Sequence, residues 1–470
     1  MRDVPLKKRL HDMTEGRPLS LILSFALPLM LGNVFQQLYT VVDTAVVGRA
    51  LGVGALAALG ASDWLNWMML SMIQGLTQGF GILMAQNYGA RNMPDLRRTI
   101  AASLLMAGIG AALLLAVGQV SLLPVLTLLH TPADIMPDAA LYLRIMFGGV
   151  PVVMAYNLFA TILRSMGDGK TPLHAMVTAS LVNIGLDLLF VLVFGWGIAG
   201  AAAATLIAQA VAAGFCLLRM AKIPEIALHK EDFRLRGSLA ARLLVLGSPM
   251  AFQNAIIALG GMIVQSVVNG FGVLFIGGFT ATNKLYGMLE IAATSYGYAM
   301  ITYAGQNLGA GKLNRIRQGQ RAAVGVSVAT SALIAAVMIF FGRSIVGIFL
   351  SGSPGEVAEA TAIAYQYLVV MSVFLPVLYI LHVTRSCVQG VGNTLLPMVS
   401  GISEFVMRTG AALLLPMAMG QTGVFFAEVL AWAGADLILI PSYFAVMKKA
   451  EKESKKPADG IRDNPGGKAG

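Results

Sequence analysis

The chain has 470 residues, of which 57% are hydrophobic and only 12% charged, and its mean hydropathy is +0.75. Such a chain has too little polar surface to cover a water-soluble globule of this length, so the composition excludes a soluble protein and indicates a polytopic membrane protein. We interpret the net charge of +10 as basic loops that set topology and contact anionic lipid headgroups, with no nucleic-acid partner.

The sequence predicts an all-α membrane protein with twelve transmembrane helices. Apolar stretches of about 20 residues are long enough to cross a bilayer core of about 30 Å as helices. Six stretches of this kind lie in each half of the chain. In chain order, the predicted helices are residues 19–46, 55–83, 97–120, 138–163, 172–194, 198–221, 243–269, 274–302, 320–342, 358–384, 395–417 and 423–447.

The second half of the chain repeats the first. Residues 28–33 (PLMLGN) return as residues 249–254 (PMAFQN), and residues 85–90 (AQNYGA) return as residues 305–310 (GQNLGA), in both cases about 220 residues later. Other landmarks keep the same order in both copies. Membrane-embedded repeats are typical of secondary transporters, whose substrate site lies between the two halves.

The positive charges predict the orientation of the chain. Most of the 33 Lys and Arg residues lie at the termini or in alternate loops. Because Lys and Arg are retained on the cytoplasmic side during insertion, we expect both termini to be cytoplasmic. The predicted segments are a cytoplasmic N-terminal segment at 1–18, a helical half at 19–221, a cytoplasmic linker at 222–242, a second helical half at 243–447 and a disordered basic tail at 448–470.

The first predicted helix carries polar side chains that hydrocarbon should exclude. Recurring at three- and four-residue steps, they share one face of the helix. They are Asn33, Gln36, Gln37, Thr40, Asp43 and Thr44. For Asp43 we favour a function, because a charge inside a span is costly and no cation lies near it in its helix. For Asn33 and Gln36, hydrogen bonds that hold helices together are an equal alternative. Pro28 removes a backbone hydrogen bond, so this helix can bend.

A second carboxylate, Asp187, lies in the fifth predicted helix. Asn183 is four residues earlier and therefore on the same face, and the sixth helix adds Thr205. Carboxylate, amide and hydroxyl oxygens are suitable ligands for a small cation and equally a place to hold a proton. We therefore predict a coupling site at Asp43, Asn183, Asp187 and Thr205. The alternative for Asp187 is a capping or end-of-span residue.

The second half lacks this cluster and has other ionisable residues in its helices. Glu404 and Arg408 are spaced at i and i+4, so we interpret them as a structural intramembrane pair whose charges compensate each other. Lys284 and Glu290 are six residues apart and are expected to face different neighbours. Glu290 is the better candidate for attracting a cation.

No pattern in the chain indicates an enzyme. A phosphate-binding glycine loop and metal-ligand spacings are both missing from the sequence, and the two cysteines, Cys216 and Cys387, have no companions spaced for a metal. We therefore expect no cofactor and no metal beyond a possible Na⁺, and transport driven by an ion gradient rather than by ATP.

Several short motifs in this order resemble the MATE multidrug exporters. They are residues 42–48 (VDTAVVG), 86–90 (QNYGA), 167–172 (GDGKTP), 183–187 (NIGLD) and 200–202 (GAA). Their order, and the partial repetition of the motifs in the second half, is more specific than any single motif.

The resemblance covers residues 14–447 and implies two pseudo-symmetric six-helix lobes that alternate between outward and inward openings. It implies export of amphiphilic, mainly cationic compounds in exchange for protons or sodium ions. It also implies that Asp43, Asn183, Asp187 and Thr205 match the first-lobe cation site of the prokaryotic branches. The carboxylates that form a second-lobe site in helices seven and ten of one branch are absent here.

Further expectations concern the cargo and the setting. Polar residues that could line the substrate cavity are Asn33, Gln36, Gln37, Tyr39, Asn254, Lys284 and Glu290. We expect a monomer in a bacterial or archaeal cell membrane, surrounded by lipids and acting on small amphiphilic molecules. A flippase for a lipid-linked substrate is the alternative function, although such a cavity would need more cations than Lys284 and Arg408. A channel or receptor is a further possibility that the sequence favours less.

Overall fold

All regular structure in residues 12–350 and 353–454, the part of the chain that the computed structural model describes, is helical. The predicted N-terminal segment and tail therefore lie partly outside the described residues. The elements in chain order are α1 (Pro18–Gly89), α2 (Met93–Leu128), α3 (Met136–Gly148), α4 (Val150–Ser165), α5 (Lys170–Asp187), η1 (Leu188–Val193), α6 (Gly197–Met220), η2 (Pro224–Ile226), η3 (Lys230–Phe233), α7 (Gly237–Asn269), α8 (Val273–Gly309), α9 (Leu313–Gly347), α10 (Pro354–Gly390), α11 (Leu395–Met419), η4 (Gly420–Phe425) and α12 (Phe426–Ser454).

These helices account for the twelve predicted spans. Within the described residues, nine helices are long and apolar enough to cross a membrane, and α3 and α4, which meet at a 47° bend, together form a tenth span. The stretch Leu395–Ser454 contains two of the predicted helices, α11 and α12, and α8 is the remaining one. Most of the side chains of α8 are buried inside the protein.

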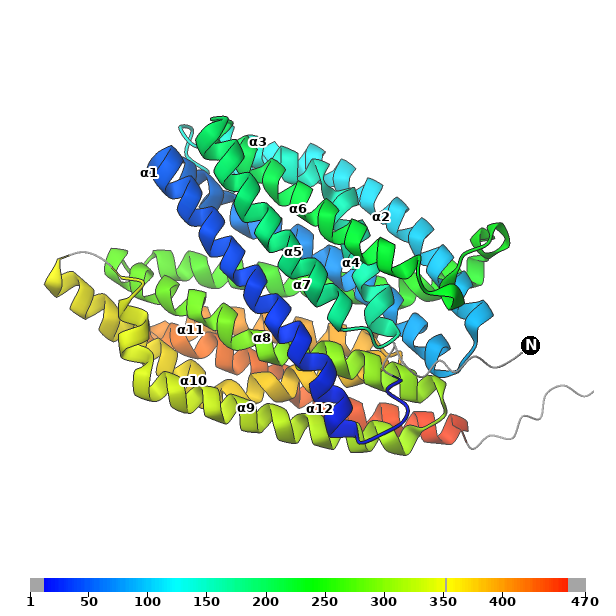
Figure 1. Ribbon diagram of the computed structural model, residues 1–470. Helices are drawn as coiled ribbons and strands as arrows, with labels where there is room; N and C mark the ends of the chain where they lie inside the picture. Colours follow the sequence, from blue (N-terminus) through cyan, green and yellow to red (C-terminus); the bar gives the residue numbers. More distant parts are fainter. Residues whose placement is uncertain (1–11, 351–352, 455–470) are drawn as a thin grey trace, which may run out of the picture.

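The helices form two lobes, α1–α6 and α7–α12, and α1 belongs to both of them (Figure 1). Near its start, Ile22, Phe25 and Leu29 pack into the hydrophobic core formed by α8–α12. Farther along, Val47 and Ala58 pack into a core with α2, α3 and α6. Figure 1 shows this path as the diagonal blue helix that begins among the lower helices and ends beside α3. The part of α1 before Gly52 is therefore packed into both lobes and connects them.

The repeat is visible in the backbone as well as in the sequence. Gly52 interrupts α1 with a φ of +86°, and its counterpart Gly272 precedes α8 with a φ of +94°. Residues that have a Cβ atom rarely adopt such positive φ values, whereas glycine does so readily. Arg91 and its counterpart Gly311 also have positive φ values, of 56° and 70°. The two halves therefore make the same turns at the same places.

The QN motif that recurs in both repeats connects the lobes at one end of the protein. Gln306 accepts a hydrogen bond from the Met13 N–H at 2.9 Å and donates to the Ser165 carbonyl at 2.8 Å. Its counterpart Gln86 donates to the Gly390 carbonyl at 3.2 Å. This end also carries the basic loops, and we refer to it as the basic end. The motif thus joins the N-terminal segment, the first lobe and the second lobe.

The predicted linker packs on the first lobe, and the start of the predicted disordered tail is ordered. In the linker, Ile223 and Ile226 are buried in the core of the first lobe, and α7 already begins at Gly237. α12 continues to Ser454, so residues 448–454, the predicted start of a disordered tail, are helical. Glu451 there forms an ion pair with Arg317 of α9 at 2.6 Å.

Two glycines let α1 and α7 approach each other closely. A Cβ atom on Gly75 would lie 2.7 Å from the Ala251 backbone, and one on Gly79 would collide with Gly247. Backbone atoms cannot move aside as the end of a flexible side chain can. Small residues permit close packing of helices in membranes, where lipid supplies no hydrophobic force to bring helices together.

We expect Gly79→Ala to lower the melting temperature of the protein in detergent, with a loss of about 1–3 kcal/mol of stability from overpacking. Gly60→Ala on the same helix is the matched control, because a Cβ there meets nothing within 4 Å. Its effect should be near zero or slightly stabilising. Equal melting temperatures for the two variants would contradict the close approach of α1 and α7.

Candidate functional site

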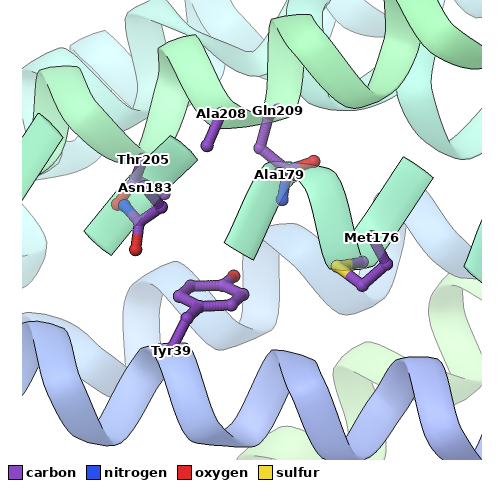
Figure 2. A pocket seen from close by; sticks show the side chains of 7 residues that line it. All are labelled: Tyr39, Met176, Ala179, Asn183, Thr205, Ala208 and Gln209. Carbon is purple, nitrogen blue, oxygen red and sulfur yellow. The ribbon is translucent and has the colours of Figure 1, made fainter. Parts of the chain in front are cut away.

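A narrow cavity inside the first lobe brings together predicted residues from two separate sets (Figure 2). It lies between α1, α5 and α6, and its volume of about 10 Å³ is the space of roughly one water molecule. The lining residues are Tyr39, Met176, Ala179, Asn183, Thr205, Ala208 and Gln209. Asn183 and Thr205 were predicted for the coupling site, and Tyr39 for the substrate cavity.

The polar side chains beside this cavity are buried without partners. Asn183 is 1% exposed and Asp187 is 0% exposed. Among the described residues, neither the amide of Asn183 nor either carboxylate oxygen of Asp187 has a hydrogen-bond partner. Burying such groups unpaired is expensive, and native proteins rarely do so without an ion, a proton or water at the site. Oxygen atoms of both residues are therefore available to a small cation.

The local structure of α5 places these two residues. Asp168 holds the start of the helix, since its carboxylate accepts from the Thr171 N–H at 2.9 Å and from the Thr171 hydroxyl at 2.7 Å. Asp187 is the last residue of α5, after which the chain continues as the π-helical turn Leu188–Val193. π-Helical turns are rare and occur often at functional sites. The predicted capping role of Asp187 is not observed, because its carboxylate bonds to no described backbone group.

Asp43 lies close to this cavity without lining it. It is one turn beyond Tyr39 on α1, and it is near enough to Asp187 for the two carboxylates to repel each other. Although the residue as a whole is half-buried, its Oδ1 atom is buried and has no partner among the described residues. The four predicted coupling residues thus lie in one region of the first lobe. This region has the chemistry of a site for a proton or for a hard monovalent cation.

One acidic residue near Asp43 was missed by the sequence analysis. Asp63, in the second half of α1, is exposed and lies within electrostatic range of both Asp43 and Lys284. Lys284 is also exposed and projects from α8. The signal that could have identified Asp63 is the one used for Asp43, a single carboxylate in an apolar span.

A second, larger cavity lies between the lobes, where α1 faces α8. Its volume is about 260 Å³, and its lining is apolar apart from one amide. The lining residues are Met30, Val34, Gln37, Leu38, Met288, Ile291 and Ala292. Of the residues predicted for the substrate cavity, Gln37 is the one that lines this space.

The other predicted cavity residues are distributed over the interface between the lobes. Asn33 donates to the Ser295 hydroxyl at 3.3 Å, and Asn254 donates to the Ser71 carbonyl at 2.8 Å. Both bonds cross from one lobe to the other, which agrees with the alternative of hydrogen bonds that hold helices together. Gln36 is half-buried on α1, and its carbonyl accepts from Thr40.

Glu290 and the pair Glu404–Arg408 lie in the second lobe. Glu290 contacts His382 Nε2 at 3.2 Å, so its carboxylate already has a potential cationic partner. Glu404 and Arg408 are in contact at 3.1 Å, as their spacing predicts. Their pair is part of a larger buried set of charges that also includes Arg385, Glu428 and Asp436, which no local spacing could reveal.

The family model described as MatE matches residues 28–189 and again residues 249–414, which is the duplication seen in the sequence. The chain is 33% identical to the probable multidrug resistance protein YpnP of Bacillus subtilis (strain 168) over 427 residues, 88% of this chain and 92% of that protein. It is 30% identical to the probable multidrug resistance protein YoeA of the same organism, over 70% of this chain and 72% of that protein.

Solved structures with the same fold are similar over almost the whole chain. The crystal structure of MATE in complex with MaL6 superposes with a TM-score of 0.86, covering 94% of this chain and 99% of that chain at 21% identity. At this level of identity the likeness establishes the two-lobed fold alone.

Proposed function

The chain belongs to the MatE family, and from this premise we propose that it is a secondary active multidrug efflux antiporter. It exports amphiphilic, mainly cationic compounds in exchange for protons or sodium ions by alternating access. The relatives named as probable multidrug resistance proteins support the export of drugs. We place the protein in a bacterial or archaeal cell membrane with both termini cytoplasmic, so that the basic end faces the cytoplasm.

The observation that carries the proposed coupling is the buried pair Asn183 and Asp187, which has no partner among the described residues. A proton or sodium ion bound here would neutralise a charge that the first lobe otherwise holds at high cost. Thr205 lines the same cavity and would add a hydroxyl oxygen. All residues of this proposed site belong to the first lobe, so binding of the cation does not require contacts with the second lobe.

Coupling between the ion and the movement of the lobes would run through α1. Asp43 is part of this helix, and the helix is packed into the cores of both lobes. Pro28 leaves one backbone carbonyl of α1 without its usual partner and so allows the helix to bend. Binding of an ion near Asp43 would change how α1 packs, and thus how the lobes meet. If drug and ion exclude each other, each weakens the binding of the other by the same factor, as antiport requires.

The cargo would occupy the cavity between α1 and α8. Its apolar lining, with two methionines and a single amide, suits an amphiphile that is bound by surface contact rather than by many directed bonds. Asp43 and Asp63 outnumber Lys284 in this region, which favours cationic over anionic cargo.

The test is ethidium efflux from proteoliposomes under an imposed pH gradient and, separately, an imposed sodium gradient. We expect one of the two gradients to drive efflux and the other to leave it at the level of liposomes without protein. Liposomes with an equal potassium gradient control for osmotic effects. Efflux that depends on neither gradient would overturn the proposal and would favour the alternative function, flipping of a lipid-linked substrate.

A further inference from the structure

We propose that the second lobe contains its own site for a proton or a small monovalent cation, at Asp436 of α12. This inference goes beyond the coupling site of the first lobe and involves none of its residues. The sequence comparison of the two halves predicts no such site, because Asp43 has the apolar counterpart Val264.

Asp436 belongs to a buried set of charged side chains from three helices, which we call the C-lobe charge cluster. Its members are Arg385, Glu404, Arg408, Glu428 and Asp436. Arg385 of α10 contacts Glu404 at 2.6 Å. Arg408 contacts Glu404 at 3.1 Å and Glu428 at 2.7 Å. All of these side chains are at least four-fifths buried.

Both arginines of the cluster are already occupied by other acceptors. Arg408 also donates to the Ile257 carbonyl at 3.2 Å. With its amide oxygen turned toward Arg385, Gln253 accepts from the Arg385 Nε at 2.9 Å. The guanidinium donors that have partners are therefore directed at Glu404, Glu428 and α7, and the buried Arg408 Nε has no partner among the described residues.

Asp436 is the carboxylate of the cluster that forms no ion pair among the described residues. It is 7% exposed, and its Oδ1 atom has no hydrogen-bond partner among the described residues. The charged groups within electrostatic range of Asp436 are Arg385 from α10 and Glu404 from α11. The cluster holds three carboxylates against two guanidinium groups, so one negative charge is left over in a buried region. His382 and Glu290 flank the cluster as a pair of their own and, when both are charged, do not change this balance.

A proton or a small cation bound to Asp436 Oδ1, the oxygen that has no donor, would neutralise this uncompensated negative charge. The unpartnered carboxylate oxygen of Asp436 is a hard ligand of the kind that sodium ions and protons prefer. Because the arginines of the cluster also hold α7 through Ile257 and Gln253, occupation of Asp436 would alter the attachment of the helix that packs against Gly75 and Gly79 of α1. Binding of the ion would thus also change how the second lobe packs against α1.

The experiment is infrared difference spectroscopy of the purified full-length protein in the carbonyl-stretch region of protonated carboxylic acids. Spectra are recorded during a pH step at constant potassium and during a sodium step at constant pH. We expect the wild type to show a band that Asp436→Asn loses and that Asp43→Asn and Asp187→Asn retain. A response to the pH step alone identifies a proton, and displacement of the band by sodium identifies a shared site for both ions.

Ser442→Ala is the matched control on α12, because Ser442 bonds only to the Ile438 carbonyl of its own helix, at 2.6 Å. It should keep the band. Asp436→Glu keeps a carboxyl group and should retain a shifted band, which preserves the test if the Asn variant fails to fold. Spectra of folded Asp436→Asn that superimpose on those of the wild type in both steps would overturn the proposal. Since no drug or transport gradient is used, this result is independent of whether the proposed efflux is observed.

Discussion

Replacing Asp187 by Asn is expected to abolish gradient-driven efflux while leaving the protein folded. The amide has the shape of the carboxylate, but it is uncharged, does not take up a proton and binds a cation weakly. Coupling energies between two ligands are typically about 1–3 kcal/mol, so loss of coupling should lower the ion-driven accumulation ratio by about 5–150-fold. Exchange of labelled for unlabelled ethidium, which needs no ion, should persist at a level nearer to that of the wild type.

The stability of Asp187→Asn provides an independent check that the loss of efflux comes from lost ion binding rather than from loss of the fold. Because the carboxylate is fully buried and has no partner among the described residues, its removal should keep or raise the melting temperature. Asp138→Asn, at an exposed position in the first turn of α3, is the control and should transport normally. Full ion-driven efflux by Asp187→Asn, or a marked loss of stability, would show that the carboxylate is structural.

Arg408→Met is expected to have the opposite signature, with a large loss of stability of about 3–5 kcal/mol. The methionine fills a similar volume, but Glu404 and Glu428 lose their shared cation inside the second lobe. Thermal unfolding in detergent, followed by loss of the monodisperse peak in size-exclusion chromatography, measures the effect. The exposed Arg343 of α9 supplies the control variant, Arg343→Met, which should melt within about 0.5 kcal/mol of the wild type.

A second substitution separates charge from packing in this result. If uncompensated charge is the cause, Arg408→Met combined with Glu428→Gln should recover part of the lost stability, because fewer buried negative charges remain unpaired. If packing is the cause, the double variant should be at least as unstable as the single one. That second outcome would also weaken the view of the C-lobe charge cluster as an electrostatic unit.

Sequence patterns were sufficient for features that depend on local spacing. The duplication, the helical segments and the contact of Glu404 with Arg408 all follow from regular intervals along the chain. Asn183 and Thr205 were grouped by chemistry and family resemblance, and the structure places both at one cavity. Tyr39 lines that cavity too, although it was predicted for the drug, because periodicity cannot tell which neighbour a helix face meets.

Features that depend on contacts between distant helices could not be predicted. The ion pair between Arg385 and Glu404 joins α10 to α11, and the contact of Glu290 with His382 joins α8 to α10. Neither pair has a spacing that signals it. Asp63 was overlooked for a different reason: within one turn it shares its helix face with a single polar residue, Asn66, which is too few to form a stripe.

The shared position of α1 sets the order in which this chain can be completed during synthesis. Ile22, Phe25 and Leu29 belong to one of the first helices to leave the ribosome, yet their final neighbours are in α8–α12, which are made much later. Until then these side chains must rest against lipid or a chaperone. The first lobe therefore has a leading helix whose start becomes fully packed only after the second lobe has been made.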